Sequence, residues 1–278
     1  GGPIIKDKLW FYTSYGIQDL GIFNTIGVAV RTFLEAAYVK LNAQVTKSTM
    51  LNLQYSYNNK DREGREPWGG GMQATDATWH QMGPSPYYRA EVEQMFGNLY
   101  LSGKVLRAYN SFYLYSPAGM PTSDMSGPYE VHRYYPSFYA YGNINNDGTE
   151  RPNTNISVNG NLFVENVLGG DHEFKFGVDY LHGALHSYSV QESNLDVELR
   201  APDYTEVILY RDFEVRLKYD RMSLYAQDTY TNGRFTFRLG LRYDNETSKI
   251  APFSQPASPW LPNYLGELAV PEIDPGIN

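Results

Sequence analysis

The chain has 278 residues, of which 15% are aromatic and only 19% are charged. Its polar mean hydropathy and its lack of a long apolar stretch exclude a helical membrane protein. The absence of cysteine excludes disulfides and thiolate catalysis, and the net charge of −8 argues against a nucleic-acid partner.

Alternation of apolar and polar residues predicts nine β-strands. The first strand stands alone, and the other eight form four pairs joined by short turns. In the last pair, Phe235 and Phe237 fall on one face, Thr236 and Arg238 fall on the other, and Asn232-Gly233 supplies the turn. The predicted strands cover residues 8–19, 38–46, 50–60, 94–101, 105–115, 155–165, 172–186, 219–231 and 235–247.

The connections between the pairs are much longer than the turns within them. The predicted long loops cover residues 62–93, 116–154, 187–218 and 248–278. Short turns that alternate with long loops are typical of outer-membrane barrels, in which the turns are periplasmic and the loops extracellular. The sequence therefore predicts an all-β, antiparallel transmembrane β-barrel with its apolar strand faces against lipid. Because bacterial single-chain barrels use an even number of strands, nine strands indicate a segment of a larger barrel.

Three stretches resemble the Oar-like group of TonB-dependent outer-membrane receptors. They are GGPIIKDKLWFYTSYG at 1–16, GGDHEFKFGVDY at 169–180 and LYAQDTYTNGRFTFRLGLRYD at 224–244. The resemblance implies a 22-stranded barrel in the outer membrane of a Gram-negative bacterium. It also implies an N-terminal plug and active uptake of a ligand with energy supplied by the TonB complex. The plug and the remaining C-terminal strands would then lie outside these 278 residues.

No set of residues predicts catalysis, and we expect no enzyme. The five histidines are scattered, and His182 and His186 lie too far apart on a strand to share a metal ion. The stretch NINNDGTE at 143–150 offers a weak calcium candidate in Asn145, Asp147 and Glu150, although Asn-Asp-Gly is also an ordinary turn. We predict no other cofactor.

Aromatic residues in the predicted loops are the main ligand-binding candidates, because flat rings with polar groups suit stacking on sugars or peptide side chains. These candidates are Trp68, Trp79, Tyr129, Tyr134, Tyr135, Tyr139, Tyr141 and Trp260. The same residues can instead pack the loops together. A second set is predicted to face the lumen and consists of Lys175, Asp179, Arg238 and Arg242.

Three other protein classes compete with the receptor. A soluble extracellular all-β module that binds carbohydrate or peptide would bury the apolar strand faces under a second sheet. A barrel enzyme would need a Ser-His or paired-carboxylate site. A passive porin or structural barrel is the third class, and the Gly-Gly-Pro junction at residues 1–3 argues against it only through the family resemblance. The ligand itself is not predicted, because specificity of this kind lies in loops.

Overall fold

The computed structural model describes residues 1–23, 27, 29–66, 72–73, 78–116, 130–133, 139–141, 145–190, 194–201 and 203–274. Every regular element in these ranges is a β-strand, so the all-β prediction is confirmed. None of the described residues forms a helix that is long and apolar enough to cross a membrane.

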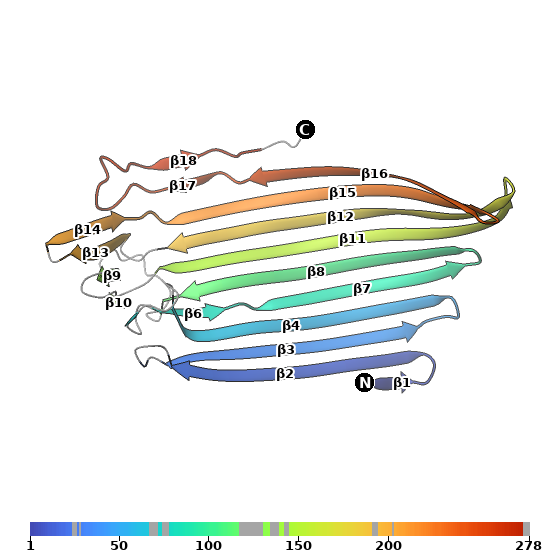
Figure 1. Ribbon diagram of the computed structural model, residues 1–278, viewed down its shortest axis with the longest axis horizontal. Coiled ribbons are helices and arrows are strands. Elements are labelled where there is room, and N and C mark those ends of the chain that lie inside the picture. The colour runs from blue at the N-terminus through green and yellow to red at the C-terminus, as the bar shows by residue number, and fades with distance from the viewer. Residues whose placement is uncertain are drawn as a thin grey trace.

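One antiparallel sheet of eleven strands makes up most of the molecule (Figure 1). Nine of its strands are long and correspond to the nine predicted ones. They are β2 (Leu9–Phe23), β3 (Ala29–Gln44), β4 (Thr49–Arg65), β7 (Ser85–Phe96), β8 (Leu99–Tyr115), β11 (Asn146–Val167), β12 (Gly170–Val190), β15 (Phe213–Asn232) and β16 (Phe235–Ile250). The short strand β1 (Gly2–Ile5) pairs with β2, and β6 (Trp79–Met82) lies with β7 between β4 and β8.

The long strands extend beyond the predicted bounds, and this corrects the predicted loops. Strand β11 begins at Asn146, inside the predicted loop 116–154, and β7 begins at Ser85, inside the predicted loop 62–93. The prediction has no strand in residues 20–37, whereas β2 and β3 fill most of them and are separated only by residues 24–28. In β11 the predicted strand is too short because polar residues occupy both faces from Asp147 to Asn153, whereas backbone pairing continues there.

The two ends of the sheet differ in their connections. At the right-hand end of Figure 1, short turns join β3 to β4, β7 to β8, β11 to β12 and β15 to β16. In the β15–β16 turn, Gly233 takes a φ of 58°, a left-handed conformation that glycine adopts without strain. The long connections leave from the opposite end, as the barrel pattern predicts.

Three of the long connections meet in a second sheet, at the left of Figure 1. Its order is β14 (Tyr204–Leu209), β13 (Leu195–Ala201), β9 (Glu130–Arg133), β10 (Tyr139–Tyr141) and β5 (Met72–Gln73). Strand β13 pairs in parallel with β9, and β10 pairs in parallel with β5. We call this five-stranded unit the loop sheet. The connection after β16 adds a separate pair, β17 (Phe253–Gln255) and β18 (Leu268–Val270).

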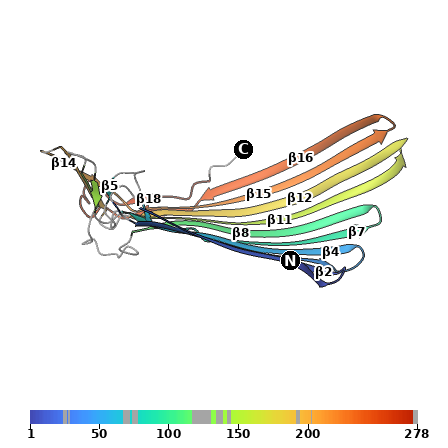
Figure 2. The same cartoon turned by 60° about the horizontal axis from the view of Figure 1, so that its bottom comes forward.

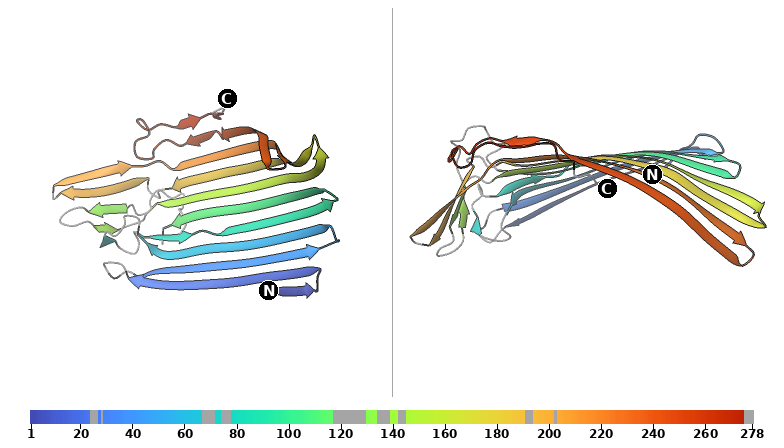
Figure 3. Two further views of the ribbon diagram at one scale, coloured as in Figure 1. Left: turned by 45° about the vertical axis from the view of Figure 1, so that its right-hand side comes forward. Right: turned by 90° about the horizontal axis from the view of Figure 1, so that it is seen from above.

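The main sheet twists and bends along its length, and in the described part of the chain no second layer covers the faces of its long strands (Figures 2 and 3). Side chains alternate between the faces along each strand, and directly paired residues share a face. One face carries large apolar side chains in the half near the short turns, and Leu239 and Leu241 on it are 78% and 81% exposed. Of the described hydrophobic residues, only Val30, Ala108, Leu114 and Leu195 are buried. The sheet therefore lacks the inter-sheet core that a soluble sandwich needs.

Candidate functional site: polar wall and outer rim

The face opposite the apolar one is a continuous polar wall. Register pairs Asn161 with Lys175 and Ser157 with Asp179 across β11 and β12. Pairing of Thr229 with Arg238 and of Tyr225 with Arg242 places the charges of β16 on this face too. All four predicted lumen-facing residues therefore lie on the polar wall.

Several charges on this wall have a partner close by. Lys175 Nζ lies 2.9 Å from Glu173 Oε1, and the Arg242 guanidinium contacts both carboxylate oxygens of Asp244 at 2.8–3.0 Å. Asn155 donates a 2.8 Å hydrogen bond to Asp179. Neighbouring charges of opposite sign make this part of the wall polar, which suits a water-filled lumen.

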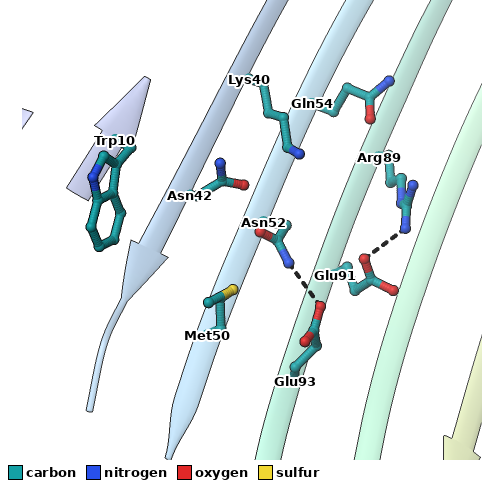
Figure 4. Close-up of a pocket in the computed structure, with 9 residues that line it drawn as sticks. All are labelled: Trp10, Lys40, Asn42, Met50, Asn52, Gln54, Arg89, Glu91 and Glu93. Atoms are coloured by element: carbon teal, nitrogen blue, oxygen red, sulfur yellow. Dashed lines mark hydrogen bonds and ion pairs between the residues drawn. The ribbon is translucent and has the colours of Figure 1, made fainter. Parts of the chain in front are cut away.

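A hollow of about 480 Å³ lies on this wall near the short turns (Figure 4). Asn52 donates to Glu93 at 3.0 Å, and Arg89 donates to Glu91 at 2.6 Å. The lining is a mixture of amides, both signs of charge and one indole, and consists of Trp10, Lys40, Asn42, Met50, Asn52, Gln54, Arg89, Glu91 and Glu93. Such a surface can hydrogen-bond to polar backbone or side-chain groups but offers no apolar pocket.

At the other end of the strands, the loop sheet forms an outer rim. Tyr139 and Tyr141, two predicted ligand-binding residues, lie in its strand β10. Trp79 begins β6, and its Nε1 donates a 2.8 Å hydrogen bond to the carbonyl of Asn145, so this indole links β6 to the residue before β11. Trp260 is 47% exposed and follows β17, outside the loop sheet.

Four of the predicted ligand-binding residues lie outside the described residues, namely Trp68, Tyr129, Tyr134 and Tyr135. The aromatic vestibule as a whole therefore stays a prediction. What the structure adds is that three loops distant in sequence are joined by backbone pairing.

The calcium candidate residues are not brought together. Asp147 and Glu150 are three residues apart in β11, so their side chains leave opposite faces of the strand. Asn145 donates to Asp147 at 2.9 Å, whereas Glu150 accepts a 2.6 Å hydrogen bond from the Tyr113 hydroxyl. Residues Asn146-Asp147-Gly148 form the start of β11 and not a turn. The extended backbone there keeps the Asp147 and Glu150 side chains apart.

The apolar face also becomes polar in the half of the strands near the long connections. There Glu150, His186 and Glu214 come from β11, β12 and β15, and His186 Nε2 lies 2.9 Å from Glu214. The hydrogen bond from Tyr113 holds the pKa of Glu150 below its usual value. Burial, with a further contribution from Tyr188, raises the pKa of Tyr115 to about 12.

Sequence reasoning missed a cluster of Asp61, Glu63 and His80 on the apolar side of the outer rim. Asp61 and Glu63 show the alternation of one strand face, but His80 reaches them only through the pairing of β6 with β4. No local sequence signal links residues so far apart.

No protein-family model and no curated protein matches this sequence. Solved structures do match. The outer membrane transporter YddB from Escherichia coli aligns with 89% of the chain at a TM-score of 0.60 and 12% identity. The ferripyoverdine receptor of the outer membrane of Pseudomonas aeruginosa aligns with 93% at a TM-score of 0.52 and 14% identity. The ferric-catecholate import receptor Fiu from E. coli, in its open form, aligns with 92% at a TM-score of 0.50 and 12% identity.

The chain covers 35%, 40% and 46% of these three structures, less than half of each. The matched proteins are described as transporters and receptors, and none as an enzyme. The predicted antiparallel barrel sheet is confirmed at the level of the fold, whereas the Oar-like group stays a prediction. The chain has the fold of a barrel segment of outer-membrane receptors and transporters.

Proposed function

We propose that this chain is part of a TonB-dependent receptor in the outer membrane of a Gram-negative bacterium. It captures a ligand at the loop sheet and passes it along the polar wall of a plugged barrel. The observation that carries the proposal is one sheet with an uncovered apolar face, a polar face, short turns at one end and joined loops at the other. The soluble binding module is not favoured, because none of the described strands forms a second sheet over the apolar face.

The polar wall supports passage of a hydrated ligand. Lys175 and Arg242 each pair with a carboxylate two residues away on the same strand, so charges of both signs lie side by side on it. The hollow around Trp10 and Arg89 lies near the short turns, which we assign to the periplasmic side. Its amides and carboxylates offer donors and acceptors to a plug that fills the lumen.

The loop sheet supports capture at the outer rim. Parallel pairing of β13 with β9 and of β10 with β5, with β9 paired to β10, holds strands of three loops side by side. A ligand at the outer rim would therefore meet residues from more than one loop.

The test compares depletion of compounds from the growth medium by cells with the full-length protein and by cells without it. We expect one class of compound to remain undepleted in the deletion strain and also in a strain that lacks TonB. Complementation with the full-length protein should restore depletion only when TonB is present. Depletion that does not require TonB, or recovery of the protein in the soluble fraction, would overturn the proposal.

A further inference from the structure

The histidines on the apolar side of the sheet each lie beside a carboxylate from a neighbouring strand. His172 contacts Asp228, and His182 contacts Asp220, each at 2.8 Å. His186 contacts two carboxylates, but through opposite ring nitrogens, so a single ion could not use both contacts. These three arrangements are hydrogen-bonded pairs between strands.

His80 differs because ligand atoms of two carboxylates, from Asp61 and Glu63, converge with one of its ring nitrogens. Its Nε2 is 2.7 Å from Asp61 Oδ1, and one ligand atom from each of Asp61, Glu63 and His80 lies within 4.8 Å of the others. Among the described residues, no other group of three His, Asp or Glu side chains converges in this way.

Strand pairing and a bulge bring the three side chains together. Asp61 pairs with Met82 and Arg62 pairs with Gln81, so the same register places Glu63 opposite His80. The register then shifts before Arg65. Gly64 lies at the shift with a φ of 70°, and a Cβ there would come within 2.6 Å of the Ala29 carbonyl oxygen. A bulge of this kind redirects neighbouring side chains, and here it needs glycine.

We propose that Asp61, Glu63 and His80 bind a divalent transition-metal ion such as Zn²⁺. Two carboxylate oxygens and one imidazole nitrogen match the ligand types of three-residue zinc sites, in which the fourth position is open. Bond lengths of about 2.0–2.2 Å in a tetrahedral site separate ligand atoms by about 3.4 Å. The 2.7 Å contact between Asp61 and His80 then opens as the metal replaces the proton between them. Nε2 gives up its proton and Nδ1 carries the ring proton, so His80 binds as a neutral imidazole, and the two carboxylate charges balance the ion.

The nearby cation does not occupy the site. Arg31, the residue that pairs with Glu63, directs its guanidinium to Asp19, where Nε and Nη2 lie 3.0 Å and 2.8 Å from the two carboxylate oxygens. Arg31 therefore interacts with Asp61 and Glu63 only through its charge, and its guanidinium hydrogen-bonds to Asp19 instead.

The position suggests what a bound ion would do. The site joins β4 to β6 across the base of the connection between them, on the outer side of the sheet. A bound ion would fasten this connection at its base. Glu63 is exposed, so water or an external group can reach the open coordination position.

The experiment measures Zn²⁺ binding by calorimetry, and Co²⁺ binding by visible absorption, on the full-length protein purified in detergent. We expect His80→Asn to bind one equivalent fewer than the parent protein. Glu63→Gln should bind at this site about tenfold or more weakly, because a carboxylate ligand is lost. Since Glu63 is exposed, Glu63→Gln tests the site even if His80→Asn fails to fold.

The matched control is His182→Asn, which disrupts a histidine–aspartate pair that has no second carboxylate. It should leave the stoichiometry and the affinity unchanged. Parent protein that binds neither ion, or Glu63→Gln that binds both as tightly as the parent, would overturn the proposal. Loss of the same equivalent in His182→Asn would overturn it as well.

Discussion

The same long strands pass through two regions that differ in the side chains on one face of the sheet. In the half near the short turns, one face of β12 presents Phe174, Phe176, Val178 and Tyr180, with the His172–Asp228 pair at its turn end. In the half near the loops, that face continues with His182 and then His186, each hydrogen-bonded to a carboxylate. Backbone pairing is unbroken between the two halves, so the change in side chains reports a change of surroundings. We call the two halves the lipid-facing region and the outer region.

A charge introduced into the lipid-facing region should have the largest effect. Leu239 lies midway along the apolar face of β16 and is 78% exposed, so Leu239→Arg places a cation against hydrocarbon. The expected cost is about 2–4 kcal/mol near the bilayer midplane. It should appear as reduced folded protein in the outer membrane and as a lower urea midpoint in vesicles. Thr247→Arg, on the same face in the outer region, is the matched control and should be nearly neutral. Equal losses in both variants would contradict the division into two regions.

A smaller effect is expected from a side chain at Gly177 on the polar wall, where the space is already occupied. Gly177 lies under the ring of Tyr225, whose hydroxyl donates a 2.9 Å hydrogen bond to Asn159. A Cβ at position 177 would come within 2.6 Å of that ring, so Gly177→Val should cost about 1–3 kcal/mol through overpacking. Gly16→Val is the control, because no atom lies within 4 Å of the Cβ position there. Refolding into vesicles, followed by unheated gel migration, measures the difference, and equal stability of the two variants would show that the wall is not closely packed at Tyr225.

The smallest predicted effect concerns acid in the outer region. The pKa of Glu150 is lowered from 4.5, chiefly by the hydrogen bond from Tyr113. Its ionised form therefore stabilises the pairing of β8 with β11 above pH 4.5, and this contribution is lost as pH falls through the lowered pKa. The contribution should be less than about 1 kcal/mol, because the group is partly solvated. Acid should accelerate amide exchange at the outer ends of β8 and β11, and this acceleration should be smaller in Tyr113→Phe than in the parent protein. Equal acceleration in both proteins would show that the Tyr113–Glu150 hydrogen bond does not cause the acid sensitivity.

The lipid-facing region could be predicted from the sequence because lipid and lumen impose a period of two. Residues 235–243 show this alternation clearly. Asn232-Gly233 predicts the turn before them, because glycine readily adopts a left-handed conformation. The outer region could not be predicted in the same way, since polar residues occupy both faces of β11 from Asp147 to Asn153. The pairing of β9 with β13 joins residues more than sixty positions apart, and no local pattern encodes it.

The candidate site shows the same contrast. Lys175, Asp179, Arg238 and Arg242 could be assigned to one face because alternation alone determines it. The convergence of His80 with Asp61 and Glu63 could not, because it depends on the register of β6 and on the bulge at Gly64. Asp147 and Glu150 were grouped wrongly for a related reason, since a turn was expected where a strand continues.

Because the 278 residues contain no cysteine, single cysteines can report which end of the strands faces the cell exterior. Asp203→Cys places a thiol between β13 and β14 in the loop sheet, and Ser48→Cys places one in the turn between β3 and β4. A membrane-impermeant maleimide applied to intact cells that carry the full-length protein should label Asp203→Cys but not Ser48→Cys. Both variants should be labelled after the outer membrane is opened, above the background of the parent protein. Labelling of Ser48→Cys on intact cells, or protection of Asp203→Cys, would contradict a barrel with periplasmic turns and extracellular loops.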